Sequence, residues 1–507
     1  MTAQEPIDIL PRCSDHYVDA LHFGACEGQR WQPFPLLIAE RPAPWREGYE
    51  QLSLQLEHQT FERVAHLEHG QELRDILEAL DSTLSIHSRP DLRTLVNWPG
   101  GAHMPVHRWF RYREGFSPQL ISALSLQSPL LDPFCGCGSI MLGAAKAGML
   151  SLGIDVSPLA VFVARTKLRP LDRRQLEEVR TFATSFEVLL DKIEPWPLPP
   201  LSIAQKVFEP AILETLLRIR AAIEVGSNDP QTLDFMLLGW LAILQAVGSY
   251  FKEGNGIKYR NKKRLPDGYV RRKEGEWQLQ RFGPDQVDFV IRAYRQQLEM
   301  MVSDASEWLS GRWTDQEVIQ GNATDMLQAL GCRRFNSIIF SPPYANRFDY
   351  FESLKVELWF GGFARSSKDV LALRKQSVRS HLGADLSRAG ARIGVLEELI
   401  ALMDRRASSW RMGVPDALRG YFEDMLHVLV QCRELLNAKG RCCVIVGNSA
   451  YAGVIIPTDA LIARLGIEAG FRSAHIAVVR HLTVAPQQRL ALTGHEQFMR
   501  ESVVVFE

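Results

Sequence analysis

The sequence predicts an α/β fold built on a mostly parallel sheet. The first observation is an apolar strand that enters a glycine turn, "LLDPFCGCGS", followed by a small-residue helix and the strand "SLGID". This is the order of a βαβ unit. The second is the return of strand patterns at "EVIQGNA", "NSIIF" and "RCCVIVG", with connections of typical α/β length. The third is the closing pair "SAHIAVVRHL" and "ESVVVFE", which we expect to form an antiparallel hairpin at a sheet edge.

The pattern along the chain divides it into four parts. Residues 1–95 have helical spacing, as at Leu73, Ile76, Leu77 and Leu80, and predict a helical accessory lobe. The sheet domain then comes in two pieces, separated by an insertion. We expect its first part at 96–170, a mainly helical insertion at 171–316, and its second part at 317–507 with a helical insert near 360–420. After that insert, we expect a helix that ends at Gly440, the C′ residue.

Composition narrows the class of protein. The formal net charge is −1, so attraction to a polyanion must come from local patches. The start lacks a basic and apolar leader, and the most apolar stretch, Phe235–Phe251, is only 17 residues long. We therefore expect a cytoplasmic protein, no membrane span and a buried helix at that stretch. The eight cysteines have no paired zinc spacing, which predicts reduced thiols and no metal site.

The glycine turn is a candidate cofactor loop. Gly136 and Gly138 permit a tight turn whose backbone amides approach a ligand at a helix N-terminus. Met141 stands where a dinucleotide fingerprint has its third glycine, which disfavours a nicotinamide cofactor. Asp155 ends the next strand, where a carboxylate can accept both hydroxyls of a ribose. Taken singly, Asp155 also suits a helix N-cap.

The turn "SPPY" follows the apolar strand "NSIIF". Because proline lacks the N–H of a central strand, the strand must end at Ser341. The turn leaves the Ser341 hydroxyl, the Pro342 carbonyl and the Tyr344 ring at the end of the strand, where open α/β sheets bind ligands. As an isolated tetrapeptide it is better explained as a simple strand-ending turn. The preceding strand, the glycine turn upstream and Asp155 together favour the functional interpretation.

Taken in order, "DPFCGCGS", "GID", "GNA" and "SPPY" resemble the motifs of S-adenosylmethionine-dependent DNA amino-methyltransferases, most closely the N4-cytosine type. The upstream segment "REGFSPQLI" resembles the family's segment near the methionine end of the cofactor. The resemblance covers about half of the chain and skips 1–95 and the insertion. It implies a Rossmann-like methyltransferase sheet, S-adenosylmethionine as cofactor and double-stranded DNA as partner.

The resemblance also implies roles for individual residues. Asp132 is assigned to the cofactor's amino group, the loop after it to the methionine part, and Asp155 to the ribose. Asn322 stands where the family often has an acid near the adenine amine. The implied cofactor-binding residues are Phe116, Ser117, Pro118, Asp132, Pro133, Phe134, Cys135, Gly136, Gly138, Ser139, Asp155, Asn322 and Ala323. Cys135 and Cys137 are expected to be small packing residues.

The chemistry expected at the turn is methyl transfer to an exocyclic amine. Two acceptors, the Ser341 hydroxyl and the Pro342 carbonyl, hold the amine hydrogens so that the nitrogen lone pair points at the methyl donor. Pro343 keeps the turn rigid, and Tyr344 stacks on a base that has left the duplex. Ring-carbon methylation is disfavoured because no cysteine lies between Cys332 and Cys432.

A basic run lies within the insertion. Nine Lys or Arg residues fall between positions 252 and 273, against two acidic ones, with tyrosines interleaved. Such a run either grips DNA phosphates or forms a solvated face. The residues expected to contact DNA are Lys258, Arg260, Lys262, Lys263, Arg264, Arg271 and Arg272.

In the resembling family, serine at the first position of the turn goes mostly with cytosine N4 and aspartate or asparagine with adenine N6. We therefore expect a site-specific cytosine-N4 DNA methyltransferase, with adenine-N6 methylation as the alternative. An RNA amino-methyltransferase and a catalytically silent DNA-binding module are further alternatives. Restriction-modification, with a separately encoded endonuclease as partner, is the setting that the resemblance implies.

Overall fold

The computed structural model describes residues 67–97, 101, 103–112, 115–253, 256–259, 262–264, 270–272, 285–308, 316–388, 390–406, 413–485 and 488–507. For 67–69, 262–264, 270–272, 308 and 406 the description covers the backbone alone. Most of the predicted lobe at 1–95 therefore lies outside the described residues.

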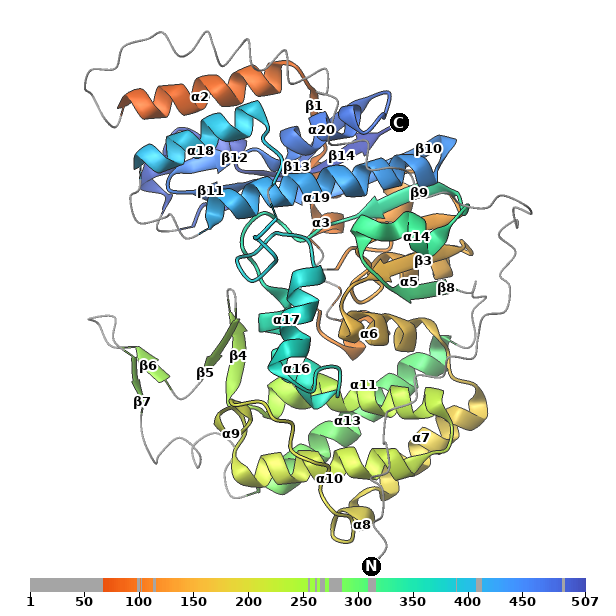
Figure 1. The fold of residues 1–507 in the computed structure, drawn as a ribbon. Coiled ribbons are helices and arrows are strands. Elements are labelled where there is room, and N and C mark those ends of the chain that lie inside the picture. The colour runs from red at the N-terminus through yellow and green to blue at the C-terminus, as the bar shows by residue number, and fades with distance from the viewer. Residues whose placement is uncertain are drawn as a thin grey trace, which may run out of the picture.

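An eight-stranded sheet forms the centre of the molecule (Figure 1). Its strands, in spatial order, are β1 (Ser85–Ser88), β13 (Ala474–His481), β14 (Arg500–Phe506), β10 (Leu436–Gly447), β9 (Phe335–Phe340), β2 (Leu130–Asp132), β3 (Ser151–Asp155) and β8 (Gln316–Gln320). All neighbours pair in parallel except where β14 runs against β13 and β10. The predicted mostly parallel, Rossmann-like sheet with a closing antiparallel pair is confirmed.

Two expectations about the edge of the sheet were wrong. The antiparallel pair does not end the sheet, because β14 lies between β13 and β10, and β1 pairs in parallel with the outer side of β13. The sheet therefore begins near residue 85, before the boundary expected at 95. A four-residue strand with a mostly exposed pattern carries no alternation of apolar residues that sequence reasoning could detect.

The order of the strands creates a crevice at the carboxyl ends of the central strands. From β2 the chain moves outward through β3 to β8, and then returns to build β9 and β10 on the other side of β2. The loops that leave β2 and β9 therefore diverge at their carboxyl ends. In open α/β sheets this reversal is where ligands bind.

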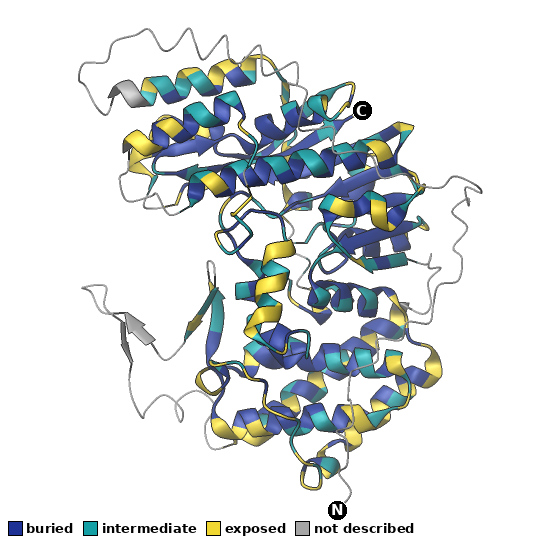
Figure 2. Cartoon of the chain, viewed as in Figure 1, coloured by how far each residue is buried: buried dark blue, intermediate teal, exposed yellow. Residues whose placement is uncertain are grey.

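Helices cover both faces of the sheet and bury its strands, which Figure 2 shows in dark blue. The flanking helices are α2 (Leu67–Ser82), α3 (Arg93–Val96), α4 (Leu120–Ala123), α5 (Ser139–Lys146), α6 (Pro158–Leu168), α14 (Met326–Leu330), α18 (Gly394–Arg406), α19 (Val414–Leu435) and α20 (Thr458–Glu468). Buried Arg500 on β14 ties this layer together, since its guanidinium donates to Asp81 of α2 and Asp459 of α20 at 2.7 Å each. Helix α2 thus packs onto the sheet domain.

The helix before β10 ends earlier than expected. Helix α19 stops at Leu435 and β10 begins at once, so Gly440 lies within the strand and is not a helix C′ residue. The face of α19 that contains Phe422, Met425 and Leu429 is fully buried. Helices α18 and α19 belong to the core against the sheet, which leaves only part of the region 360–420 as an insert.

The insertion forms a mainly helical lobe below the sheet (Figure 1). Its helices are α7 (Arg173–Ser185), α8 (Glu187–Leu190), α9 (Ala204–Val207), α10 (Pro210–Gly226), α11 (Pro230–Val247) and α13 (Gln286–Trp308). Among the described residues, α11 is the one helix long and apolar enough to cross a membrane, and 56% of it is buried. Its Trp240 is buried, and the indole donates to the Leu216 carbonyl of α10. The predicted buried helix is confirmed.

Short elements complete the chain. Between the lobe and the sheet lie α15 (Tyr350–Ser353), α16 (Lys355–Phe360) and α17 (Ser367–Gln376). Three two-stranded hairpins pair β4 (Tyr250–Glu253) with β5 (Gly256–Tyr259), β6 (Lys262–Arg264) with β7 (Val270–Arg272), and β11 (Ser449–Tyr451) with β12 (Val454–Ile456). Single 3₁₀ turns are η2 (Pro90–Leu92), η4 (His107–Trp109), η5 (Ala323–Asp325), η7 (Leu490–Leu492) and η8 (Glu496–Phe498).

Candidate active site

The glycine loop leaves β2 and turns sharply into α5. Gly136 has φ 50° and Gly138 has φ 78°, the left-handed region that favours glycine. A side chain at Gly138 would also meet Ala164 of α6 at 3.3 Å. Gly138 is therefore the residue that lets α5 begin tightly against α6, while Gly136 lies at the crevice.

Asp155 holds this loop from the neighbouring strand. Its two carboxylate oxygens accept the backbone N–H groups of Gly136 at 2.9 Å and of Ser157 at 2.8 Å. Burial raises its pKa to about 6, although both hydrogen bonds oppose the shift. The N-cap of α6 is Ser157, whose hydroxyl accepts from the Ala160 N–H at 3.3 Å. The capping alternative for Asp155 is therefore wrong.

Asp132 is the second carboxylate of the crevice. It ends β2, is 3% exposed, and accepts one hydrogen bond, from the Phe134 N–H at 3.1 Å. Burial, reinforced by the nearby charge of Asp155, raises its pKa to about 8. Among the described residues, no cation pairs with either carboxylate. The crevice therefore presents two carboxylates whose charged forms a cationic ligand would stabilise.

We call the space around these carboxylates the loop cavity. The sequence-predicted residues that line it are Phe116, Asp132, Pro133, Phe134, Cys135, Gly136, Ser139, Asp155, Asn322, Ala323, Ser341 and Pro343. Ser117, Pro118 and Gly138 do not line it. Ser117 is buried and its hydroxyl accepts from Gln119, and Pro118 packs against Gly143 of α5. These residues support the wall from behind.

Asn322 lines the loop cavity, but its side chain already has two partners. The amide oxygen accepts the Thr324 N–H at 3.0 Å as the N-cap of η5, and the amide nitrogen donates to the Gln376 carbonyl at 2.9 Å. The oxygen keeps one lone pair for a ligand. Its contact with an adenine amine stays a prediction.

The opposite wall of the loop cavity comes from residues that sequence reasoning missed. Tyr350 and Phe351 of α15 lie there, with Ser377, Val378 and His381 beyond α17. The Ser377 hydroxyl lies 3.1 Å from the His381 ring. These residues follow the turn in the chain but carry no motif, so only the aromatic pair Tyr350 and Phe351 close behind it offered a signal.

Ser341 lies where two cavities meet. Strand β9 ends at Phe340, and Ser341 lines both the loop cavity and a larger neighbour of about 1120 Å³, which we call the open cavity. Within the part of the chain that the structure describes, neither its hydroxyl nor the Pro342 carbonyl takes part in a hydrogen bond. Tyr112 and Phe116 also line both cavities. Both predicted acceptors are thus unengaged at the end of β9.

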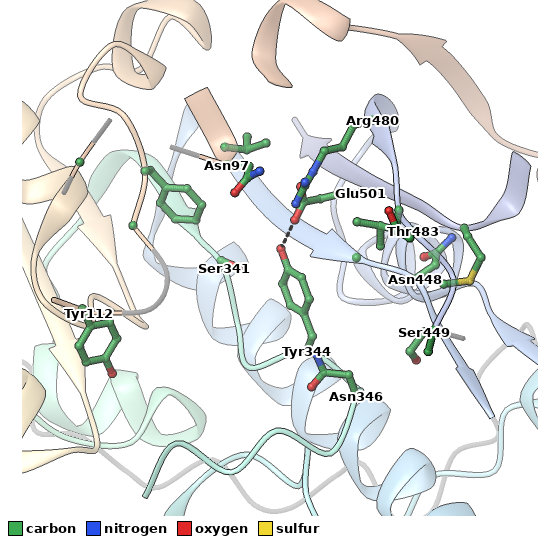
Figure 3. A pocket seen from close by; sticks show the side chains of 18 of the residues that line it. Asn97, Tyr112, Ser341, Tyr344, Asn346, Asn448, Ser449, Arg480, Thr483 and Glu501 are labelled. Atoms are coloured by element: carbon green, nitrogen blue, oxygen red, sulfur yellow. Dashed lines mark hydrogen bonds and ion pairs between the residues drawn. The ribbon is translucent and has the colours of Figure 1, made fainter. Parts of the chain in front are cut away.

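The open cavity is polar and positively charged. Four arginines line it, at positions 108, 111, 347 and 480, and Glu501 is the one acidic residue among its described lining. Two of the arginines are paired with carboxylates, Arg108 with Asp304 and Arg480 with Glu501, at 2.5 Å each. Asn97, Asn346, Asn448, Ser449 and Thr483 add amide and hydroxyl groups (Figure 3). Such a lining suits a ligand that combines negative charge with hydrogen-bonding edges.

Tyr344 projects into the open cavity and is tied at its tip. Its hydroxyl donates to Glu501 at 2.9 Å (Figure 3), and Glu501 also accepts from the Arg480 guanidinium at 2.5 Å. Sequence reasoning missed Asn448, Arg480 and Glu501. Asn448 directly follows the predicted strand "RCCVIVG", and a polar residue at a strand's carboxyl end was the available signal.

The residues of the basic run differ in their placement. Lys258 on β5 is exposed. Lys262, Lys263, Arg264, Arg271 and Arg272 lie on the paired strands β6 and β7, where Lys262 stands opposite Arg272 and Lys263 opposite Arg271, and Arg260 lies outside the described residues. Lys252, at the start of the run, is engaged in an ion pair with buried Glu357 of α16 at 2.7 Å. It therefore has a structural role.

The two cysteines of the loop are buried at 5% exposure. Burial and the nearby carboxylates raise the pKa of the Cys135 thiol. A thiol kept protonated is a poor nucleophile, which agrees with the predicted packing role.

The chain resembles known methyltransferases over most of its length, although no family model matches it. It is 24% identical over 451 residues to the Type II methyltransferase M.BsoBI of Geobacillus stearothermophilus, covering 82% of this chain and 88% of that protein. It is 23% identical over 423 residues to the Type II methyltransferase M.AvaI of a Nostoc species, covering 76% and 83%.

Among solved structures, the chain matches the rRNA methyltransferase aviRa of Streptomyces viridochromogenes. The two are 10% identical in sequence, and the match covers 80% of this chain and 92% of that one. Its TM-score of 0.25 is too low to support an argument about the fold, which depends on the sheet described above. Over most of its sequence, the chain is similar to Type II methyltransferases.

Proposed function

We propose that this protein is a DNA methyltransferase that transfers a methyl group from S-adenosylmethionine to the N4 amine of cytosine. The similarity to Type II methyltransferases extends over most of both chains and supports methyl transfer in a restriction-modification setting. The positive lining of the open cavity supports a nucleic acid as the substrate.

The observation that carries the proposal is the position of Ser341. It stands at the junction of the two cavities, and its hydroxyl and the next carbonyl have no partner among the described residues. A ligand in one cavity and a substrate in the other would meet at this junction, which Tyr112 and Phe116 also line. Ser341 places one unengaged acceptor at this junction, whereas Pro342 is buried and is not among the described lining of either cavity. We propose that the Pro342 carbonyl accepts the second hydrogen of the amino group from the end of the same strand.

The loop cavity fits S-adenosylmethionine by its chemistry. This cofactor carries an ammonium and a sulfonium charge, and the cavity holds two buried carboxylates without a cationic partner in the described chain. We assign Asp132 to the ammonium group and Asp155 to the ribose. Because Asp155 already accepts two N–H groups, it would accept the ribose hydroxyls through its remaining lone pairs.

The bound cofactor would supply an electrophilic methyl group at its sulfonium. The residues of this chain would position the acceptor. Ser341 and Pro342 accept the two amine hydrogens, which directs the nitrogen lone pair toward the loop cavity. Pro343 restricts the turn so that both acceptors are aimed before the reaction, and Tyr344 supports the ring of a base that has left the duplex.

The experiment is to incubate the protein with unmethylated DNA and S-adenosylmethionine, digest the DNA, and identify the nucleosides by mass spectrometry. We expect N4-methylcytosine. N6-methyladenine alone would reject cytosine and favour the adenine alternative, whereas 5-methylcytosine would overturn the mechanism. Methylation of RNA but not of DNA would reject the substrate. Ser341→Ala in parallel controls for a contaminating activity.

A further inference from the structure

Glu501 is the one carboxylate among the described residues that line the open cavity. It is 5% exposed, and both of its oxygens are engaged. One accepts the Tyr344 hydroxyl at 2.9 Å and the other the Arg480 Nε at 2.5 Å (Figure 3). Hydrogen bonds between a guanidinium and a carboxylate are shorter and stronger than those between neutral groups.

Three neighbouring strands place this group. In the register of the sheet, Glu501 on β14 stands opposite Gly447 on β10 and opposite Arg480 on β13. The row Gly447–Glu501–Arg480 thus crosses the reversed strand near the carboxyl ends of its two neighbours. The insertion of β14 between β10 and β13 brings a carboxylate to the edge where Tyr344 lies.

Tyr344 is restrained at its ring as well as at its tip. A Cβ added to Gly447 would lie 3.0 Å from the ring edge of Tyr344, so the ring packs against the backbone at the end of β10. The hydroxyl, at the other end of the side chain, is bound to Glu501. A tyrosine has two rotatable side-chain bonds, and these two contacts restrict both.

We propose that Glu501, itself held by Arg480, is a positioning residue that fixes the Tyr344 ring as the surface on which the substrate base stacks. This inference rests on the proposed function, and it adds residues that the motif does not contain. The orientation of Tyr344 then depends on the antiparallel strand and not only on the rigid prolines before it. The hydrogen bond keeps the ring in place before the base arrives, which reduces the entropy lost on binding.

Glu501 has a second possible role, direct contact with the base. Both of its oxygens already have partners, and one of them is the hydroxyl of the residue expected to stack. The two roles predict different relations between mutants. A positioning role acts through the Tyr344 hydroxyl. Removing that hydroxyl and removing the Glu501 charge should therefore lower turnover equally, and the two losses should not add when both changes are combined.

The test is a double-mutant cycle of Tyr344→Phe and Glu501→Gln. A matched control is Glu507→Gln. Glu507 directly follows β14, the strand that contains Glu501, and it is paired with Arg441 at 2.7 Å, away from both cavities. Turnover at saturating DNA, DNA affinity, S-adenosylhomocysteine affinity by calorimetry and thermal unfolding are measured for each variant.

We expect each single variant to lower turnover about tenfold, the equivalent of one hydrogen bond to a charged group. The turnover of the double variant should also be about tenfold below that of the wild type. The affinity for S-adenosylhomocysteine should not change, and Glu507→Gln should behave like the wild type. Gly447→Ala should lower turnover similarly, because the added methyl group displaces the ring.

Three results would overturn the inference while leaving the proposed function standing. They are wild-type turnover of Tyr344→Phe, a double variant that shows the product of the two single losses, and a loss in Glu501→Gln far larger than in Tyr344→Phe. A wild-type protein that methylates no base would instead contradict both the inference and the proposed function. Tyr344→Phe keeps the ring, so a folding defect in Glu501→Gln still leaves the first result decisive.

Discussion

The two cavities that meet at Ser341 are built in different ways. The carboxylates and the glycine turn of the loop cavity come from residues 132–157, one continuous strand, turn, helix and strand. The open cavity draws on positions from Val96 to Glu501, and its labelled polar groups come from the ends of several strands and from loops (Figure 3). The carboxylates of the loop cavity are therefore local in sequence, although the rest of its lining extends from Tyr112 to His381. The polar groups of the open cavity are brought together only by the sheet.

Because the two cavities draw on different parts of the chain, mutations in them should affect cofactor affinity and turnover differently. Asp155 both faces the loop cavity and holds the Gly136 N–H, so a change there disturbs cofactor binding through the loop itself. A change in the open cavity alters groups that the loop does not need. We therefore expect mutations to separate cofactor affinity from turnover, and the following predictions test that separation in order of decreasing effect on turnover.

Ser341→Ala is expected to have the largest effect. Removing one aimed hydrogen-bonding group from a reacting centre costs roughly 10²–10³ in turnover. Because the hydroxyl acts on the substrate, cofactor affinity measured by calorimetry should not change. Ser122→Ala is a matched control, since that hydroxyl donates to the Gln119 carbonyl at an exposed helix end. An equal loss of cofactor affinity would show that the two cavities are not separate.

Asp155→Ala should have the next largest effect, on the loop cavity. It removes the acceptor of two N–H groups and of the proposed ribose contact. Cofactor affinity should fall by about 1–3 kcal/mol, and calorimetry measures it directly. Asp155→Asn keeps one acceptor oxygen, so its cofactor affinity should lie between those of the wild type and Asp155→Ala. Unchanged affinity in a folded Asp155→Ala protein would remove this residue from the site.

Asp132 predicts a pH dependence of stability. Burial raises its pKa from 3.8 to about 8, so the folded state holds a proton that the unfolded chain releases near pH 4. The contribution of this group is present below about pH 4 and is lost as the pH rises through about 8. The thermal stability of ligand-free Asp132→Asn should therefore improve relative to the wild type between pH 4 and pH 8. A constant difference would contradict the buried, protonated carboxyl.

The same carboxyl predicts a pH dependence of cofactor binding. A cationic group beside Asp132 favours its charged form, so binding should release a proton and strengthen as the pH rises toward 8. The gain is at most about tenfold per pH unit. Calorimetry in buffers of different ionisation enthalpy counts the proton. Asp132→Asn should show no release, and release of the same size in that variant would point to another group.

Strands β6 and β7 form a two-stranded sheet separate from the central one, and we expect the effect of this hairpin on turnover at saturating DNA to be the smallest. Its register sets cationic residues opposite each other, as with Lys262 and Arg272, an unfavourable pairing that phosphates would relieve. Replacing Lys262, Lys263 and Arg264 by Ala should reduce the slope of log DNA affinity against log salt by ~0.9 per lost contact.

The control for the hairpin is the triple replacement of the α7 arginines Arg173, Arg174 and Arg180 by Ala, which keeps the change in net charge the same. It should leave the slope near that of the wild type. Equal slopes for the hairpin variant and the wild type would mean that the run is a solvated surface.

The sequence alone determined the features that depend on backbone chemistry within a few residues. Glycine is needed where φ is positive, as at Gly136 and Gly138, and proline ends a central strand, so the turn at Ser341 was predictable from "SPPY". The parallel pairing of β2 and β3 followed from the helix expected between two apolar strands, because parallel neighbours need such a crossover. For the same reason the position of Asp155 beside the loop was foreseen.

The tertiary structure alone decided which distant residues meet. The row of Gly447, Glu501 and Arg480 exists because β14 runs in reverse between β10 and β13. The alternation of apolar residues shows which face of a strand is buried, but it does not show which strands are neighbours or in what register. Tyr344 was predicted as a stacking ring from its motif. Its anchor, more than 150 positions away, depends on packing across the whole sheet and carries no local signal.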